Sequence, residues 1–230
     1  MQRNRRQNAK EPVIPRRPRD KIAGFRCSYR TSMSSYDDYG PYLAAYEGDL
    51  FVFLNDKQEY DDREHPAGQV RLFVLNADAA ESEGEDLFDV LDERAETAAY
   101  IPLLGDDAGN FSRAVCKILG EEMVFCRNIL ILDRLEILPR FRGQQLGLQY
   151  VRAAISRFGI GCRLAAIKPF PLQFEGKMGT ASETETVEPS KSVRADFDAA
   201  TKKLKKYYAR EGFISLRNSD LMILDLDEGR

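Results

Sequence analysis

A basic turn that contains two glycines carries the clearest chemical signal in this sequence. It covers residues 140–148 (RFRGQQLGL) and separates an apolar stretch from an amphipathic one. The first N–H groups of a helix have no partner within the helix, and they lie at the positive end of its dipole. Arg140 and Arg142 add full positive charges just before that point. This pattern is typical of a phosphate-binding turn, and a pyrophosphate is its natural ligand.

Two elements must position this turn. Residues 129–138 predict a buried central strand, because apolar residues occupy both of its alternating faces. Pro139 ends the strand. One predicted face holds Ile129, Ile131, Leu135 and Ile137, and the other holds Leu130, Leu132 and Leu138. From Gln144 the apolar residues recur at the spacing of a helix, which Gly159 ends. They form one stripe, which consists of Leu148, Val151, Ile155 and Phe158.

Two carboxylates interrupt the central strand. Strict alternation places Asp133 and Glu136 on opposite faces, with Asp133 on the face of Ile131 and Leu135. A carboxylate inside an apolar strand needs a partner. Each is a candidate general base, and each could instead form a structural ion pair, which for Asp133 would involve Arg134 or Arg163.

The rest of the chain alternates between strand and helix patterns. Predicted strands cover residues 49–55, 69–76, 163–167, 213–216 and 221–226, and predicted helices cover 86–104, 113–119 and 196–210. The first two strands form an antiparallel hairpin around an acidic loop at 57–68. We expect an α/β fold with a mixed, mostly antiparallel central sheet flanked by helices.

The predicted organisation is an arm followed by one domain. Residues 1–22 are basic, contain three prolines and should be disordered. Residues 23–230 should form a single domain, with a helical insertion at about 84–120 and a mobile Ser/Thr/Glu-rich loop at about 175–193.

Composition excludes several classes of protein. A net charge of −3 argues against nucleic-acid binding by the protein as a whole. The basic arm could contact a nucleic acid or ribosome weakly, but the usual behaviour of termini favours a solubilising or vestigial tail. The four cysteines and one histidine lack metal-site spacing, so no metal is expected. No apolar stretch has the length of a transmembrane helix, and the N-terminus lacks a signal-peptide pattern, so we expect a cytoplasmic protein.

Two landmarks resemble the GNAT superfamily of acyltransferases. The run LEILPRFRGQQLG is similar to its cofactor motif, which is Gln or Arg, two residues, Gly, one residue, then Gly or Ala, after a strand and a proline. Arg142 matches the first position and Gly147 the last, whereas Gln145 stands where the first glycine belongs. The second landmark is a C-terminal Tyr, three residues, Gly and Phe, which Tyr208 and Gly212-Phe213 match. The resemblance covers residues 124–227.

The resemblance implies an N-acetyltransferase with acetyl-coenzyme A as co-substrate and an amine of a small molecule or protein as acceptor. It implies that the backbone of Leu135, Glu136 and Ile137 binds the pantetheine arm. The pyrophosphate would be held by N–H groups of Arg142, Gly143, Gln144, Gln145, Leu146, Gly147 and Leu148. It also places Tyr208 as the acid that reprotonates the thiolate, although a tyrosine on the apolar stripe of a helix is also an ordinary core residue.

Three points stay open at this stage. Gln145 and the uncertain base leave room for a non-catalytic acyl-coenzyme A-binding or interaction protein. The acceptor is not named by the sequence, since acceptor pockets come from variable loops, here 25–46, 57–68 and 175–193. The third open point is the path of the proton: only about one alkyl amine in a thousand is neutral at pH 7, so either a base residue or water must take the proton of the amine.

Overall fold

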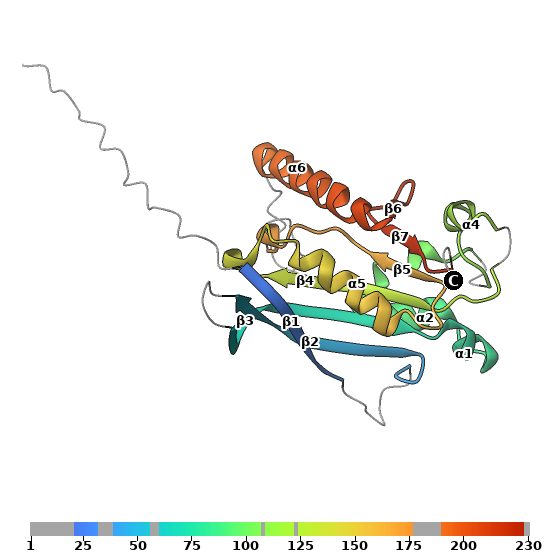
Figure 1. Ribbon diagram of the computed structural model, residues 1–230. Helices are drawn as coiled ribbons and strands as arrows, with labels where there is room; N and C mark the ends of the chain where they lie inside the picture. Colours follow the sequence, from blue (N-terminus) through green and yellow to red (C-terminus); the bar gives the residue numbers. More distant parts are fainter. Residues whose placement is uncertain are drawn as a thin grey trace, which may run out of the picture.

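A seven-stranded sheet forms the centre of the molecule, for which the computed structural model describes residues 21–31, 39–55, 60–106, 109–121, 124–176 and 190–227 (Figure 1). The strand order is β1-β2-β3-β4-β5-β7-β6. The bounds are β1 Lys21–Arg30, β2 Leu43–Asn55, β3 Tyr60–Leu75, β4 Ile129–Ile137, β5 Leu164–Ile167, β6 Ile214–Ser215 and β7 Met222–Asp225. Among these strands only β4 and β5 are parallel neighbours, so the predicted mixed, mostly antiparallel α/β sheet is confirmed.

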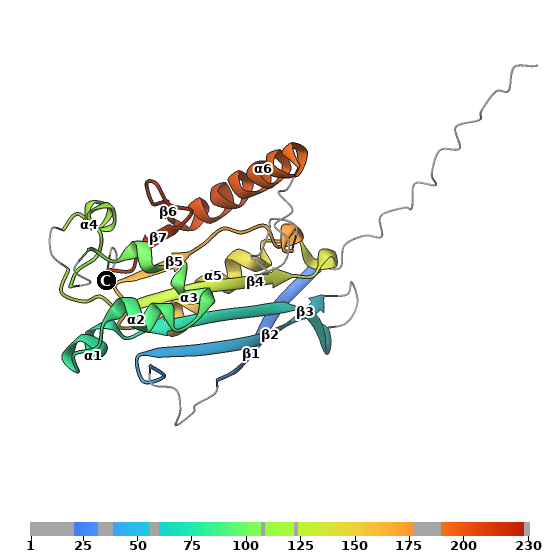
Figure 2. The ribbon, with the colours of Figure 1, turned by 180° about the vertical axis from the view of Figure 1, so that it is seen from behind.

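Helices cover both faces of the sheet. Between β3 and β4 lie α1 (Ala77–Ser82), α2 (Leu87–Asp92), α3 (Ala95–Ala98), the 3-10 turn η1 (Ile101–Leu103) and α4 (Arg113–Leu119). The later elements are η2 (Pro139–Phe141), α5 (Leu146–Phe158), η3 (Leu172–Phe174), α6 (Lys191–Tyr208) and η4 (Ala209–Glu211). Helix α5 crosses one face, and α2 and α3 lie on the other (Figures 1 and 2). Two hydrophobic clusters result, one on each side of the sheet.

Several predicted boundaries were wrong. The single helix expected at 86–104 is broken, because Arg94 has extended backbone angles and Pro102 opens a separate 3-10 turn. Strand β3 includes most of the loop expected at 57–68, and its register with β2 is irregular there. The sequence analysis did not predict β1. This strand lies at the edge of the sheet, and its exposed residues alternate with residues that are only half-buried, so the sequence shows no clear apolar face.

Part of each segment that was expected to lack structure belongs to a regular element. Lys21 and Ile22 belong to β1, and residues 1–20 of the predicted arm lie outside the described residues. Helix α6 begins inside the loop expected at 175–193, where the Ser190 hydroxyl accepts a hydrogen bond from the Val193 N–H. Residues 177–189 lie outside the described part of the chain.

A β-bulge at Asp133 reverses the faces of β4 partway along the strand. Arg71 pairs with Arg134, but the next residue of β3, Leu72, pairs with Leu132, so Asp133 is an extra residue. Leu135 and Ile137 therefore pack with Leu130 and Leu132 on the α5 side, rather than with Ile129 and Ile131 as predicted. The same bulge places Asp133 and Glu136 on one face, which corrects the prediction of opposite faces.

Candidate functional site

The two parallel strands separate beyond the bulge, and a pocket of about 590 Å³ lies at the separation. The pairing of β4 with β5 ends at Leu132 and Ile167. Beyond that point β4 continues to Ile137, whereas the chain after β5 turns through residues 170–173. The pocket is lined by residues from β4, the basic turn, residues 170–173 and α6: Leu135, Glu136, Ile137, Phe141, Arg142, Gly143, Gln145, Leu146, Gly147, Phe170, Pro171, Leu172, Gln173, Ala200, Lys203, Leu204, Tyr207, Tyr208 and Arg210.

The second half of β4 presents backbone groups to this pocket. Its other neighbour is β3, and the N–H of Leu138 donates to the carbonyl of Ala67 on that side. Backbone polar groups alternate in direction along a strand, so the N–H and C=O of Leu135 and the N–H of Ile137 point away from β3. The carbonyl of Ile137 points the same way and accepts a hydrogen bond from Arg142 Nε at 2.7 Å. Leu135 thus offers both a donor and an acceptor to an extended ligand.

The N-terminus of α5 opens into the same pocket. Gly143 and Gln145 both have left-handed backbone angles, with φ of 79° and 62°. Gln145 is the N-cap and makes no capping hydrogen bond through its side chain. Within the described part of the chain, the N–H groups of Leu146 and Gly147 have no hydrogen-bond acceptor. Such a turn presents adjacent N–H groups to an anion.

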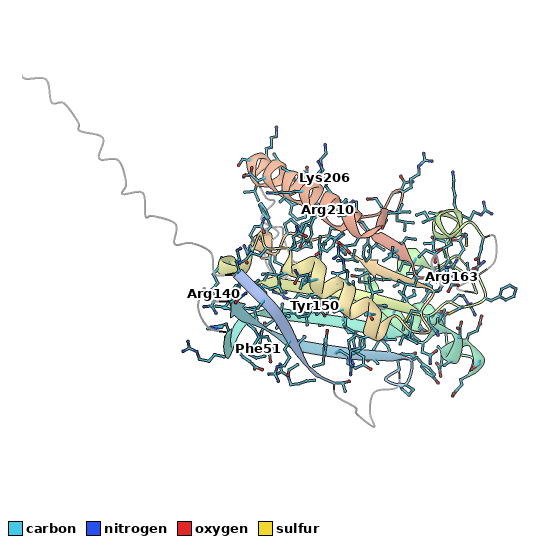
Figure 3. The ribbon with its side chains drawn as sticks, viewed as in Figure 1. Phe51, Arg140, Tyr150, Arg163, Lys206 and Arg210 are labelled. Carbon is cyan, nitrogen blue, oxygen red and sulfur yellow. The ribbon has the colours of Figure 1, made fainter. Side chains whose placement is uncertain are left out.

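Cations surround the pocket. Arg142 belongs to the basic turn, Lys203 belongs to α6, and Arg210 belongs to η4, which follows α6 directly. Figure 3 shows Arg210 together with Lys206 of α6. Glu136 is the acidic residue of the lining, and it is bound to Arg134 at 3.3 Å. The charge and the free N–H groups together favour a ligand with several phosphate oxygens.

Most of the predicted cofactor residues lie together in this pocket, and two of them point elsewhere. The Gln144 side chain is turned toward β1, where its Oε1 accepts a hydrogen bond from the Ile22 N–H at 3.4 Å. Leu148 is buried, and its N–H donates to the Gln145 carbonyl and to the Tyr207 hydroxyl. We therefore assign the anion-binding N–H groups to the turn and to Leu146 and Gly147, rather than to Leu148.

Tyr208 is both a core residue and a pocket residue. Its ring lies 5.5 Å from the ring of Tyr207 and 6.2 Å from that of Phe213, and it is 7 % exposed. Burial raises the pKa of Tyr208 well above its usual range, because the ionised phenolate would be poorly solvated. Its hydroxyl is therefore protonated at neutral pH and can donate a hydrogen bond to a group in the pocket.

Asp133 lies on the face of the sheet opposite to α5. Its carboxylate accepts a hydrogen bond from Arg71 Nε at 2.7 Å, and Arg71 also binds Glu96 of α3 at 2.7 Å. Burial raises the pKa of Asp133, although the hydrogen bond from Arg71 opposes that shift. Both partners expected from the sequence were wrong, because Arg134 is bound to Glu136 and Glu175, and Arg163 is bound to Asp225 and Glu121. The partner comes instead from β3, across the bulge.

Glu136 is the more exposed of the two predicted bases. Arg134 holds its carboxylate at 3.3 Å and holds Glu175 at 2.7 Å. The hydrogen bond from Arg134 lowers the pKa of Glu175. Glu136 therefore belongs to a partly exposed ion-pair network beside the pocket, whereas Asp133 is the less exposed carboxylate, at the point where the strands separate.

Tyr100 was missed by the sequence reasoning. It is fully buried on the Asp133 side of the sheet, and its hydroxyl makes no hydrogen bond of normal geometry. Burial raises the pKa of Tyr100, and the Asp133 carboxylate raises it further, whereas the backbone of Lys168 lowers it. The only signal in the sequence was one tyrosine in an Ala- and Leu-rich helical stretch, and its approach to Asp133 depends on packing.

Comparisons with known proteins identify no relative, since no family model, no curated protein and no solved structure matches this chain. Within the described residues, no helix combines the length and the apolar character needed to cross a membrane.

Proposed function

We propose that this protein is an acyl-coenzyme A-dependent N-acyltransferase that moves an acetyl group from acetyl-coenzyme A to an amine. One observation carries the proposal. The free backbone edge of β4 and the open N-terminus of α5 meet in one pocket, at the place where β4 and β5 separate. A pantetheine arm carries amides at intervals along an extended chain and ends at a pyrophosphate, so it matches this order of groups.

The pantetheine arm would add to β4 as an extra strand. Its amides would bond to the N–H and C=O of Leu135 and to the N–H of Ile137. The pyrophosphate would then lie against the N–H groups of the turn, Leu146 and Gly147, with Arg142, Lys203 and Arg210 balancing its charge. The thioester would lie near the bulge, beside Tyr208.

The reaction is direct attack on the thioester by the neutral amine. Asp133 accepts the proton that the amine loses, and the C–N bond forms as the C–S bond breaks. Tyr208 donates its proton to the leaving thiolate, after which Asp133 releases a proton to solvent and the Tyr208 phenolate takes one up from solvent. The raised pKa of Asp133 suits a base, since a weakly solvated carboxylate holds a proton more readily.

A thiol-release assay tests the proposal. Acetyl-coenzyme A is offered with a panel of amines that includes small monoamines, diamines, amino acids and lysine peptides, and free coenzyme A is measured over time. The proposal expects release that depends on the amine and on the protein.

Binding of acetyl-coenzyme A without release with any amine would favour the other candidate, a non-catalytic acyl-coenzyme A-binding protein. The observation behind that candidate is Gln145, whose side chain lies in the pocket lining with a strained backbone.

A further inference from the structure

The Tyr207 hydroxyl lies at the start of α5, although Tyr207 itself belongs to α6. Its oxygen accepts a hydrogen bond from the Leu148 N–H at 3.1 Å, and it would lie 2.9 Å from a Cβ added to Gly147. Tyr207 also belongs to the lining of the pocket. The hydroxyl is therefore a side-chain group of α6 that reaches the anion-binding end of α5.

The backbone of α5 does not depend on this hydroxyl. The Leu148 N–H also donates to the Gln145 carbonyl at 3.0 Å, so it would stay paired without Tyr207. A phenylalanine at position 207 would keep the ring contact with Tyr208, whose ring centroid is 5.5 Å away. Pairing within the protein therefore does not account for the hydroxyl, and the pocket is the place where it can act.

The hydrogen of the Tyr207 hydroxyl has no acceptor among the residues that the structure describes. A hydroxyl that accepts one hydrogen bond can still donate another. The same pocket is lined by further donors and cations, which are the N–H groups of Leu146 and Gly147 and the side chains of Arg142, Lys203 and Arg210. Donors that converge without an acceptor favour an anionic ligand with several oxygens.

The direction of the helix N–H groups defines where that ligand would meet the hydroxyl. Consecutive N–H groups in the first turn of a helix point the same way, toward its N-terminus. An oxygen bound by the Gly147 N–H would thus lie beside the oxygen bound by the Leu148 N–H, which is the Tyr207 hydroxyl. The Leu148 N–H also polarises this hydroxyl and makes it a stronger donor.

We propose that the Tyr207 hydroxyl donates a hydrogen bond to a pyrophosphate oxygen of the bound acetyl-coenzyme A. This inference rests on the proposed function and adds a side chain to its phosphate-binding groups. Leu146 and Gly147 bind the pyrophosphate through their N–H groups, and the hydroxyl takes the place of the Leu148 N–H as the next donor in the row. Tyr207 is a binding residue, and the proton donor of the reaction remains Tyr208.

Tyr207→Phe tests the assignment, because it removes the hydroxyl and keeps the ring. The dissociation constant of acetyl-coenzyme A should rise at least about tenfold, which is the lower range for loss of a hydrogen bond to a charged group. The dissociation constant of S-acetylpantetheine, which has the same arm and no phosphate, should stay unchanged. Calorimetry measures the first constant and protein-observed NMR the second. A smaller loss for acetyl-coenzyme A, or an equal loss for both ligands, would overturn the assignment.

Tyr207→3-fluorotyrosine separates donation to the ligand from acceptance within the protein. Fluorine makes the phenol more acidic, so the hydroxyl donates a stronger hydrogen bond and accepts a weaker one. At mildly acidic pH the phenol keeps its proton, and acetyl-coenzyme A should bind more tightly than it binds to the wild type. Weaker binding would mean that the hydroxyl serves only as an acceptor for the Leu148 N–H, and the assignment would fail.

Tyr150→Phe is the matched control. Tyr150 is a buried tyrosine of α5 outside the pocket lining, and its hydroxyl accepts a hydrogen bond from the Tyr29 hydroxyl at 3.0 Å (Figure 3). Loss of that acceptor should lower the melting temperature and leave the affinity for acetyl-coenzyme A unchanged. A loss of affinity as large as that of Tyr207→Phe would show that removal of any hydroxyl near α5 weakens binding, and it would overturn the assignment.

The same titrations distinguish failure of this inference from failure of the proposed function. Wild-type protein that binds acetyl-coenzyme A but transfers no acetyl group to any amine would overturn the transferase activity, and the loss in Tyr207→Phe would still support the hydroxyl as a phosphate ligand. Wild-type binding with unchanged affinity in Tyr207→Phe would overturn the inference alone. Wild-type protein that binds no acetyl-coenzyme A would overturn both.

Discussion

The Tyr207 hydroxyl accepts a hydrogen bond from the backbone N–H of Leu148 at 3.1 Å, and this bond joins α6 to the first turn of α5. The same hydroxyl fills the space beside Gly147, where an added Cβ would lie 2.9 Å from it. Gly147 also approaches Leu135 of β4 at 3.4 Å, measured from that added Cβ to Cδ2. One glycine therefore lets two helices and the free edge of β4 meet at the pocket.

Gly147→Glu should abolish binding of acetyl-coenzyme A. The new side chain has no space beside Tyr207 and Leu135, so it enters the pocket, where its charge repels phosphate. Calorimetry should detect no binding, while circular dichroism stays close to that of wild type. Gly24→Ala is the control, because its Cβ would meet only Phe53 at 4.0 Å, and it should bind normally. Normal affinity in Gly147→Glu would remove the pocket from the account.

Gln145→Gly should stabilise the protein. A left-handed conformation costs a non-glycine residue about 1–2 kcal/mol, and the greater freedom of glycine in the unfolded chain offsets part of that, so we expect a net gain of about 0.5–1 kcal/mol. Urea unfolding measures this gain. Binding of acetyl-coenzyme A should be retained or tightened, because a side chain leaves the pocket lining.

The matched variant for Gln145 is Asn218→Gly, at the other non-glycine residue with a left-handed φ in the described part of the chain, where φ is 59°. It should leave binding unchanged, because Asn218 is not part of the pocket lining. A lower stability for Gln145→Gly would mean that the Gln145 side chain makes a contact that outweighs the strain.

Arg71→Met should move the acidic limb of the pH profile to higher pH. The proposed base works only when ionised, so kcat/KM falls as pH falls through the pKa of Asp133, which burial holds above its usual range. Arg71 opposes that shift, and its removal lets the pKa rise further. A profile of kcat/KM against pH measures the change, with Arg30→Met as control because the exposed Arg30 binds Asp49 instead. An unmoved limb would exclude Asp133 as the base.

Tyr208→Phe should lower kcat by a factor of about 10²–10⁴ while the dissociation constant of acetyl-coenzyme A changes little. The ring and its contacts with Tyr207 and Phe213 remain, so the fold is preserved, but the leaving thiolate loses its proton donor. Steady-state kinetics and calorimetry together separate the two effects. Full activity in this variant would leave Tyr208 as a core residue only.

Asp225→Ala changes a residue outside the pocket lining and should lower the free energy of unfolding. Asp225 of β7 is bound to Arg163, whose side chain is 4 % exposed. Removal of one partner from a buried ion pair leaves an unpaired charge and costs about 3–5 kcal/mol. Thermal unfolding measures the loss, and acetyl-coenzyme A binding below the lowered melting temperature should be normal. A loss under about 1 kcal/mol would mean that Glu121 and Asp227 suffice to hold Arg163.

The central part of the fold could be predicted from sequence because its signals are local. Three elements follow from the spacing of apolar residues and from the prolines and glycines that end a strand or helix. They are the strand before Pro139, the helix before Gly159 and the helix at 113–119. The bulge at Asp133 could not be predicted, since it depends on how β4 pairs with β3. The partner of Asp133 could not be predicted for the same reason, because Arg71 lies on a neighbouring strand. Tyr100 was missed because its surroundings also depend on packing between elements that are distant in sequence.

The site was predictable only where it is continuous in sequence. Residues 135–147 carry a motif, so most of the pocket lining on β4 and the basic turn could be named beforehand. The opposite wall could not, because Phe170 reaches the pocket through the course of the chain after β5, and Lys203 and Arg210 reach it through the packing of α6 and η4. The sequence of this region shows only that lysines recur along a predicted helix.

Calorimetric titration of acetyl-coenzyme A into the folded wild-type protein tests the central claim most directly. The account predicts saturable binding at one site per chain, lost in Gly147→Glu and kept in Gly24→Ala. Absence of binding to protein that is folded by circular dichroism would contradict the account. The pocket between β4 and α5 would then serve a different ligand.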